Sequence, residues 1–314
     1  MRPYFFLIAF LSALLGSCSG QKDASSTSDD SAPVDSGVWH VAVMPTADCL
    51  PFFLAADHGF FQAAGLQVSL DCYLAQMDVD TALLHGSASI GITDLVRAQK
   101  LERDGLLLRY LTATNASWQL VSNRLARIKK LQQLDDKMVA MTRYSATDLL
   151  SDVLVDSGRL KTERVFRIQV NDVGVRKGML RSGIIDALFL PEPQSTEARL
   201  HKHPVLLDTR QMDLQLGAIV ATQQFAQQHE DELKTFVSAY NQAVDSLNKQ
   251  GLLTYRTLLS QRLGINGAVA DSLCRSLPPF LPVAQPREKD TEYVKNWWEK
   301  RIASMKYVET RYIQ

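Results

Sequence analysis

The stretch Leu83-Leu84-His85-Gly86-Ser87-Ala88-Ser89-Ile90-Gly91-Ile92-Thr93-Asp94-Leu95 decides the fold. It predicts the end of a helix, a glycine stop, a short buried strand and then the polar pair Thr93-Asp94, where the next helix begins. In an open α/β sheet the carboxyl ends of the strands face the ligand crevice, so this pair is a candidate contact for a small molecule. Because the pattern repeats over Met179–Pro193, we expect two similar lobes that share one cleft.

The first residues predict export and lipid attachment. Arg2 precedes an apolar run over residues 4–15, which is too short for a permanent transmembrane helix but suits the core of a signal peptide. The following Leu15-Gly16-Ser17-Cys18 resembles the bacterial lipobox, whose cysteine is lipidated and becomes the first residue of the mature protein. We therefore expect residues 1–17 to be a lipoprotein signal peptide and Cys18 to carry the lipid, the alternative being a plain secretory signal.

A polar segment follows the predicted lipidation site. Residues 18–37 are rich in Ser, Asp, Ala and Gly and lack apolar periodicity, so they cannot bury enough surface to become ordered. They predict a disordered tether. Since no later stretch has the length of a membrane span, membrane contact is expected through the N-terminal lipid only. We expect the protein in the cell envelope, facing the periplasm, or at the outer face of the cell membrane in a single-membrane cell.

Composition and cysteine usage exclude several classes. The 314 residues carry 34 basic and 34 acidic side chains, so no overall basic field exists to hold nucleic acid. The chain is long enough for two domains. Without a CxxC spacing, neither a redox nor a zinc role has support. A Cys49–Cys72 bridge is conceivable because both cysteines lie at one predicted sheet edge, while buried thiols are the default. We expect no metal, no cofactor and a monomer.

Strands and helices alternate along the body of the chain, which predicts α/β lobes with mainly parallel sheets. Crossings between the lobes are expected at residues 115–117 and over the run 216–222. Lobe 1 is then 38–117 with 217–314, lobe 2 is 118–216, and the helical C-terminal tail packs back on lobe 1. Predicted strands are 39–44, 66–73, 89–93, 106–114, 118–123, 138–141, 165–170, 184–190 and 205–208. Predicted helices are 52–64, 76–85, 95–103, 145–156, 173–180, 192–200, 230–249, 252–263, 268–275 and 288–305.

Four stretches resemble a known family. Phe53–Val68 matches the pattern A-x-x-x-G-F-F-x-x-x-G-L-x-V, and Gly86–Leu95, Arg143–Asp148 and Gly183–Pro193 match further segments, with Ser89 where an Asp is usual. The resemblance is to the solute-binding proteins of nitrate, sulfonate, taurine and thiamine-pyrimidine ABC importers. It implies a type II periplasmic binding protein fold, a ligand cleft between two lobes, and delivery of a small solute to an ABC permease and its ATPase, without enzymatic activity.

The candidate ligand contacts lie at strand ends, at one helix start and on nearby aromatic side chains. For Asp48, Asp94 and Ser145 the alternative role is helix capping, and for the aromatic residues it is core packing. Arg143 is the only cation close to the motifs. The candidates are Thr46, Ala47, Asp48, Phe52, Thr93, Asp94, Asn115, Trp118, Tyr144, Ser145, Ala146, Thr147 and Glu192.

The acidic candidates favour a ligand that donates hydrogen bonds. If Asp48, Asp94 and Glu192 share the cleft, the preferred ligand is an amino-heterocycle such as a thiamine pyrimidine precursor, with sulfonate, taurine or nitrate as the alternative. A ligand-binding sensor lipoprotein would use the same surfaces. A thiamine-pyrimidine synthase-like enzyme is disfavoured because its Cys-rich motif is missing and the cysteines here are scattered.

Overall fold

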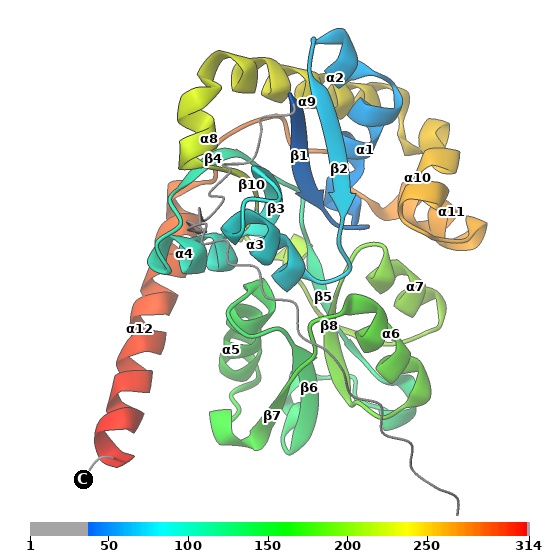
Figure 1. The fold of residues 1–314 in the computed structure, drawn as a ribbon. Coiled ribbons are helices and arrows are strands. Elements are labelled where there is room, and N and C mark those ends of the chain that lie inside the picture. Colours follow the sequence, from blue (N-terminus) through cyan, green and yellow to red (C-terminus); the bar gives the residue numbers. More distant parts are fainter. Residues whose placement is uncertain (1–36, 313–314) are drawn as a thin grey trace, which may run out of the picture. The chain divides into compact units, whose positions relative to one another are not determined.

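Two five-stranded sheets organise the chain (Figure 1). The computed structural model describes residues 37–312, with side chains over 37–304. In the first sheet three neighbouring strands are parallel, β10 is antiparallel to both of its neighbours, and four of the five strands therefore run the same way. Its order is β2 (Gln67–Cys72), β1 (Val38–Val43), β3 (Ile90–Asp94), β10 (Gly217–Thr222) and β4 (Leu108–Ala113).

The second sheet repeats this plan. Here β5 is the strand antiparallel to its neighbours, and the other four share one direction. Its order is β7 (Val165–Gln169), β6 (Lys137–Met141), β8 (Ala187–Pro191), β5 (Trp118–Ser122) and β9 (Val205–Asp208). In each sheet the reversed strand, β10 in the first and β5 in the second, is the first strand after the chain crosses from the other sheet. These strand directions agree with the prediction of mainly parallel sheets.

Helices flank both sheets. We call the first sheet with α1–α4 and α8–α11 the first lobe, and the second sheet with α5–α7 the second lobe. The helices of the first lobe are α1 (Leu50–Asp57), α2 (Phe60–Ala63), α3 (Gln76–Leu84), α4 (Leu95–Arg103), α8 (Gln223–Gln228), α9 (Glu230–Gln250), α10 (Arg256–Arg262) and α11 (Gly267–Ser276). Those of the second are α5 (Ala146–Gly158), α6 (Val173–Ser182) and α7 (Gln194–Leu200), and α12 (Glu288–Tyr312) closes the chain.

One predicted helix is two in the structure. The segment 52–64 was expected to be continuous, but α1 ends at Asp57 and α2 begins at Phe60. Gly59 between them has a φ of 71°, a left-handed conformation that no continuous helix contains. The short helix α8 is an element that the sequence did not predict, because its run of Gln residues lacks apolar periodicity.

The C-terminal helix α12, which was expected to pack back on the first lobe, contacts the second lobe as well. Trp298 Nε1 donates a hydrogen bond to Val96 O of α4 at 3.1 Å, and Trp297 Nε1 donates to Asp152 of α5 at 2.7 Å. Figure 1 shows α12 running from the first lobe alongside α5. The Trp298 side chain is buried in an apolar cluster that includes residues of both lobes, so α12 packs against both.

The two segments that cross between the lobes lie side by side. Residues 114–117 join β4 to β5, and residues 209–216 join β9 to β10. Thr114 N donates to Gly217 O at 3.0 Å. A Cβ on Gly217 would lie 2.2 Å from Thr114 Oγ1 and 2.5 Å from Ala116 Cβ, so the crossings can approach this closely only because residue 217 is glycine.

The structure also bears on the cysteines, on membrane-spanning helices and on metal ligands. Cys49 and Cys72 are both free thiols, the first buried and the second exposed, so the conceivable bridge between them is not formed. Within residues 37–312 no helix is long and apolar enough to cross a membrane, and no cluster of metal-ligating side chains occurs. The predicted signal peptide, the lipidation of Cys18 and most of the predicted tether lie outside the described residues.

Residues 37–314 form a compact unit by themselves. This unit contains both sheets and both large apolar clusters of the described chain. A segment with its own complete sheets and buried core has what a domain needs to fold alone. It is therefore a suitable fragment for experiments that must avoid the apolar N-terminal segment.

Candidate ligand-binding site

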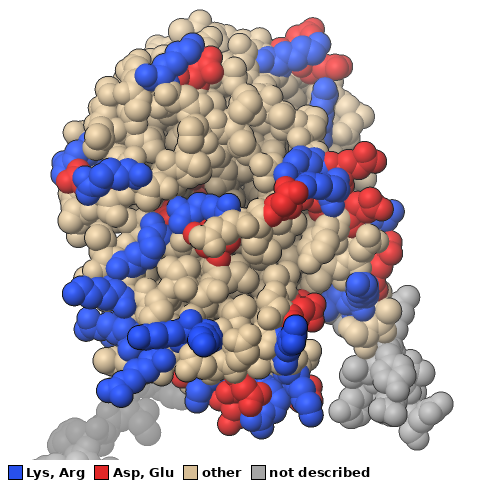
Figure 2. Space-filling view, turned by 180° about the vertical axis from the view of Figure 1, so that it is seen from behind, with Lys and Arg blue, Asp and Glu red and all other residues tan. Residues whose placement is uncertain are grey.

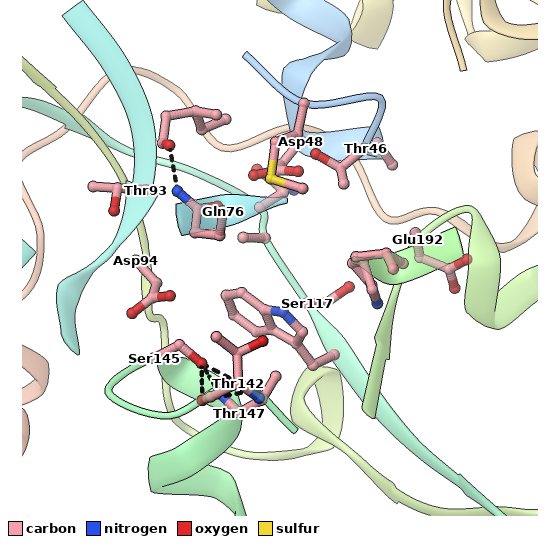
Figure 3. A pocket seen from close by; sticks show the side chains of 18 of the residues that line it. Thr46, Asp48, Gln76, Thr93, Asp94, Ser117, Thr142, Ser145, Thr147 and Glu192 are labelled. Atoms are coloured by element: carbon pink, nitrogen blue, oxygen red, sulfur yellow. Dashed lines mark hydrogen bonds between the residues drawn. The ribbon is translucent and has the colours of Figure 1, made fainter. Parts of the chain in front are cut away.

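A cavity of about 60 Å³ lies between the two lobes, at the carboxyl ends of β1, β3 and β6 (Figure 3). One water molecule needs about 10–15 Å³ by this measure, so the cavity accommodates a small polar molecule in this conformation. The lining residues come from both lobes, from the crossing at residues 115–118 and from the loop after α11. They are Met44, Thr46, Ala47, Asp48, Gln76, Ile92, Thr93, Asp94, Asn115, Ala116, Ser117, Trp118, Thr142, Ser145, Thr147, Val173, Arg176, Pro191, Glu192, Leu277, Pro278 and Phe280.

Hydrogen bonds between the lobes close the cavity. Ala47 N, in the loop after β1, donates to Glu192 O at the end of β8 at 2.9 Å. Asp94 Oδ1, at the end of β3, accepts a hydrogen bond from Ala146 N at 3.0 Å. The lobes are therefore in contact on two sides of the cavity, and an isolated antiparallel bridge joins Ala75 of the first lobe to Asp172 of the second.

Asp94 caps its own helix as well as contacting the other lobe. Its Oδ1 accepts hydrogen bonds from Val96 N and Arg97 N, both at 3.0 Å, so the capping role considered from the sequence is real. Burial raises the pKa of the Asp94 carboxyl to about 6, although hydrogen bonding and Arg97 act in the opposite direction. Three backbone N–H groups, those of Val96, Arg97 and Ala146, therefore hold the buried Asp94 carboxyl in place at the cavity.

Asp48 lies across the cavity from Asp94, in the loop after β1 (Figure 3). Its carboxylate accepts a hydrogen bond from Thr114 Oγ1 at 3.4 Å. It caps neither the short 3₁₀ turn nor α1, since neither helix start has a side-chain cap. Burial raises the pKa of Asp48 above its usual value, with the Thr46 and Thr114 hydrogen bonds opposing the shift.

Arg176 supplies a buried cation to the cavity, and the sequence analysis did not select it. Its Nη1 donates to Phe189 O at 2.8 Å and its Nη2 donates to Thr142 Oγ1 at 3.1 Å. Among the described residues it forms no ion pair, and its buried Nε has no hydrogen-bond partner. Burial lowers the pKa of Arg176 to about 10, so the guanidinium remains charged at neutral pH.

The start of α5 forms the floor of the cavity. Ser145 is the N-cap: its Oγ accepts a hydrogen bond from Thr147 N at 3.1 Å. Thr147 Oγ1 accepts from Thr142 N at 2.9 Å. Asp148 does not complete a capping box with Ser145, because its Oδ2 accepts from Tyr144 N instead. The hydroxyls of the α5 start are thereby fixed at the cavity wall (Figure 3).

The Glu192 carboxylate points away from the cavity (Figure 3). Its Oε2 accepts hydrogen bonds from Thr196 N at 3.0 Å and Thr196 Oγ1 at 2.6 Å, and its Oε1 lies 2.9 Å from Arg199 Nη1. Glu192 thus faces the lining through its main chain, while its charge is neutralised inside the second lobe. Of the three acidic candidates, only Asp48 and Asp94 therefore present a carboxyl group to the cavity.

The structure brings ten of the thirteen predicted site residues to the cavity and places three elsewhere. Phe52 is fully buried in the core of the first lobe, 4.9 Å from the Tyr240 ring. Tyr144 stacks on Trp298 of α12 with ring centroids 5.6 Å apart. The buried Ala146 contacts Asp94 through its backbone rather than facing the cavity. Arg143 is exposed and does not line it. The ten are Thr46, Ala47, Asp48, Thr93, Asp94, Asn115, Trp118, Ser145, Thr147 and Glu192.

Nothing in the sequence marked Gln76 or the loop after α11 as part of the cavity wall. Gln76 begins α3 and is held by a hydrogen bond from its Nε2 to Ile92 O at 3.0 Å. Phe280 and its neighbours belong to the loop after α11, which Asn115 fixes: Asn115 Nδ2 donates to Pro279 O at 2.8 Å, and Asn115 Oδ1 accepts from Leu281 N at 2.6 Å. Asn115 therefore positions part of the wall, and only the tertiary fold brings this distant loop to it.

The profile of the family described as "NMT1/THI5 like" matches residues 46–250. This match covers more than half of the chain. The chain belongs to the NMT1/THI5-like family. The matched region runs from the loop after β1 to the end of α9 and includes all of the second lobe. No curated protein matches the sequence.

Solved structures show the same fold. The periplasmic aliphatic sulphonate binding protein SsuA from Escherichia coli is 18% identical, with a TM-score of 0.71 over 84% of this chain and 93% of that one. The alkanesulfonate-binding protein SsuA from Xanthomonas axonopodis pv. citri, bound to MOPS, is 19% identical, with a TM-score of 0.73 over 85% and 93%. The periplasmic nitrate-binding protein NrtA from Synechocystis PCC 6803 is 14% identical, with a TM-score of 0.68 over 80% and 74%. The predicted type II periplasmic binding protein fold is confirmed.

Proposed function

We propose that this chain is the substrate-binding protein of an ABC importer. It captures a small solute between its two lobes and delivers it to a permease. The family membership and the likeness to binding proteins support this proposal. We also propose that Cys18 carries the lipid anchor in the cell envelope and that the lobes open and close about the crossings at residues 114–117 and 209–216.

The observation that carries the proposal is that two residues of the cavity wall, one from each lobe, have a buried polar atom without a hydrogen-bond partner in the described part of the chain. Thr93 Oγ1 and Arg176 Nε are buried and have no hydrogen-bond partner among the described residues. A buried polar group without a partner is costly, so a bound solute that pairs with these atoms stabilises the closed conformation. Because the two atoms belong to different lobes, one solute that contacts both favours closure.

The charges of the wall define the ligand class. Asp48 and Asp94 of the first lobe accept hydrogen bonds from an amino group, and Arg176 of the second lobe binds an acid group or another acceptor. A small molecule with an amino group at one end and an acceptor at the other satisfies both lobes. An aminopyrimidine with a hydroxymethyl group and taurine both have this arrangement, whereas nitrate and a simple alkanesulfonate lack the amino group.

Calorimetric titration of the purified protein tests this ligand class. The panel is a hydroxymethyl aminopyrimidine, taurine, ethanesulfonate and nitrate. We expect one of the two amino compounds to bind at one molecule per chain, with ethanesulfonate and nitrate at least about tenfold weaker, because they leave the carboxyls of Asp48 and Asp94 unpaired. Equal or tighter binding of ethanesulfonate would show that the amino group is not recognised.

A sensor is the second candidate function, because a receptor would contact the same lobes. Binding of the ligand is common to both functions. Uptake of the radiolabelled ligand by cells with and without the intact gene separates them. Import predicts loss of uptake in the deletion strain, and sensing predicts unchanged uptake.

A further inference from the structure

The second lobe carries an exposed cluster of basic side chains at the end opposite the cavity. The loops at this end are the β5–β6 connection, the turn before β8 and the loop before β9. Figure 2 shows Lys and Arg side chains crowded at the lower left of the back face, with few acidic side chains among them. We call this cluster the basic end patch. Its members are Arg124, Arg127, Lys129, Lys130, Arg181 and Lys202, with the apolar Leu125 and Ile184 among them.

Contacts join the three loops that carry the basic end patch. Arg124 N contacts His203 Nδ1 at 3.2 Å, which brings the loop of Lys202 beside the β5–β6 connection. Asn123 Nδ2 donates to Leu180 O at 3.1 Å, which brings the end of α6 to the same place. A Cβ on Gly183 would lie 3.6 Å from Leu125 Cδ1, so the turn that holds Ile184 also abuts Leu125.

The charges of the basic end patch are not neutralised inside the protein. None of its six cations forms an ion pair within the described part of the chain. The nearby Asp135 pairs with Arg164 at 2.6 Å, whereas Asp186, whose Oδ2 accepts a hydrogen bond from Met138 N at 2.9 Å, keeps its charge but forms no ion pair with the six cations. The balanced charge of the whole chain therefore conceals a local excess of positive charge.

The apolar members of the basic end patch are unusually exposed. The relative exposure of Leu125 is 72% and that of Ile184 is 60%. Aliphatic side chains that protrude between unpaired cations fit a surface with an anionic outer layer and an apolar layer beneath it. We propose that the basic end patch docks on a bilayer that contains anionic lipids.

The position of the patch and the expected anchor favour a bilayer over an acidic protein. The patch lies at the amino ends of the parallel strands, so docking there leaves the cavity at the opposite strand ends free. The tether up to residue 36 joins the first lobe at the amino end of β1, at the other end of the molecule from the patch (Figure 1). With a reach of about 60 Å when fully extended, this tether and the proposed lipid on Cys18 hold the whole protein close to the membrane but do not by themselves turn the patch towards it. A tethered surface needs only weak intrinsic affinity to dock, because its local concentration is high.

Flotation of the fragment 37–314 with lipid vesicles tests the proposal. One vesicle type contains phosphatidylcholine alone and the other contains phosphatidylglycerol in addition. The test variant is Arg127→Glu, Lys129→Glu and Lys130→Glu combined. The control is Arg275→Glu, Lys295→Glu and Lys300→Glu, which changes the net charge equally at exposed cations that also form no ion pair. Thermal unfolding of each variant establishes that it is folded.

We expect the wild-type fragment to bind the phosphatidylglycerol vesicles and not those of phosphatidylcholine alone, with binding weakened by salt. The test variant should bind at least about 100-fold more weakly, since each basic residue near such a surface contributes roughly a factor of five. The control variant should bind within about threefold of the wild type, and Leu125→Ser should bind about tenfold more weakly than the wild type.

Three results would overturn the proposal. The first is equal binding to both vesicle types. The second is an equal loss in the test and control variants, which would reduce the effect to net charge. The third is binding to an acidic polymer such as polyglutamate without binding to vesicles, which would assign the basic end patch to a polyanionic partner.

Discussion

Asp94 Oδ1 accepts a hydrogen bond from Ala146 N at 3.0 Å, so one carboxylate caps two helices that belong to different lobes. The bonds to Val96 N and Arg97 N cap α4, and the bond to Ala146 N caps α5. A helix N-terminus stabilises negative charge, and here two such termini converge on one group. Asp94 therefore couples the start of both helices to closure of the cavity.

Replacement of Asp94 by alanine should reduce both stability and ligand affinity. At pH 7, loss of two caps lowers the free energy of unfolding by about 2–3 kcal/mol, whereas Asp94→Asn keeps the acceptor and should stay within about 1 kcal/mol of the wild type. Urea unfolding measures the free energy of unfolding of both variants. Asn266→Ala is the control, because Asn266 caps α11 away from the cavity through Val269 N and should cost about 1 kcal/mol without changing affinity. An Asp94→Ala protein as stable as the wild type would refute the double cap.

Asp94 should also make stability depend on pH. Its pKa is about 6 in the folded chain and near 3.8 when unfolded, so the folded state binds more protons between these values. Its favourable contribution is complete below about pH 4 and is lost as the pH rises through 6. The free energy of unfolding of the wild type minus that of Asp94→Asn should fall by up to about 3 kcal/mol from pH 4 to pH 7. Parallel pH curves for the two proteins would be inconsistent with a raised pKa.

Gly217 should be intolerant of a side chain. An added Cβ would lie 2.2 Å from Thr114 Oγ1 and 2.5 Å from Ala116 Cβ, which forces the crossing strands apart. We expect Gly217→Ala to lower the free energy of unfolding by about 1–3 kcal/mol and to weaken ligand binding. The matched control is Gly178→Ala in α6, where nothing lies within 4 Å of the added atom and helix propensity predicts a gain of up to about 1 kcal/mol. Equal stability of the two variants would contradict the close approach of the crossings.

The cysteines of the fragment 37–314 should all be free. Alkylation in denaturant without reductant should modify Cys49, Cys72 and Cys274, as read from the intact mass, and prior reduction should change nothing. In the folded protein Cys72 should react first, because Cys49 is buried and burial raises the pKa of its thiol well above the usual value. Two unmodified cysteines before reduction would indicate a disulfide.

The fold was predictable from local patterns because most elements have strong ones. The apolar strand and glycine stop around residues 86–94 and the caps at Asp94 and Ser145 predicted both the elements and the strand ends that face the cavity. The break at Gly59 was missed because a glycine inside a helical pattern signals either a tolerated residue or a terminus. The contact of α12 with the second lobe was missed because periodicity indicates an apolar face but not the lobe that covers it.

The site was predictable at strand ends and not beyond them. The loop after the first strand gave Thr46 and Asp48, and the end of β3 gave Thr93. Arg176 lies within α6, where an arginine in the sequence resembles any surface cation. Glu192 was correctly placed by its strand end, but its carboxylate is held by Thr196 and by Arg199, seven residues further along the chain. Which way a polar side chain points depends on partners that only the fold supplies.

Arg176 provides the most direct test of the central claim that a solute binds between the lobes. We would release the bound molecule from natively purified protein, identify it by mass spectrometry, and titrate it calorimetrically into the wild type, Arg176→Met, Arg176→Lys and the control Arg167→Met. Arg167 is also largely buried in the second lobe but pairs with Asp152 and does not line the cavity.

We predict binding at one molecule per chain to the wild type and to Arg167→Met. Binding to Arg176→Met should be at least about 100-fold weaker, and binding to Arg176→Lys intermediate, because lysine retains the charge but not the planar fork. Unchanged affinity in a folded Arg176→Met protein would contradict the account.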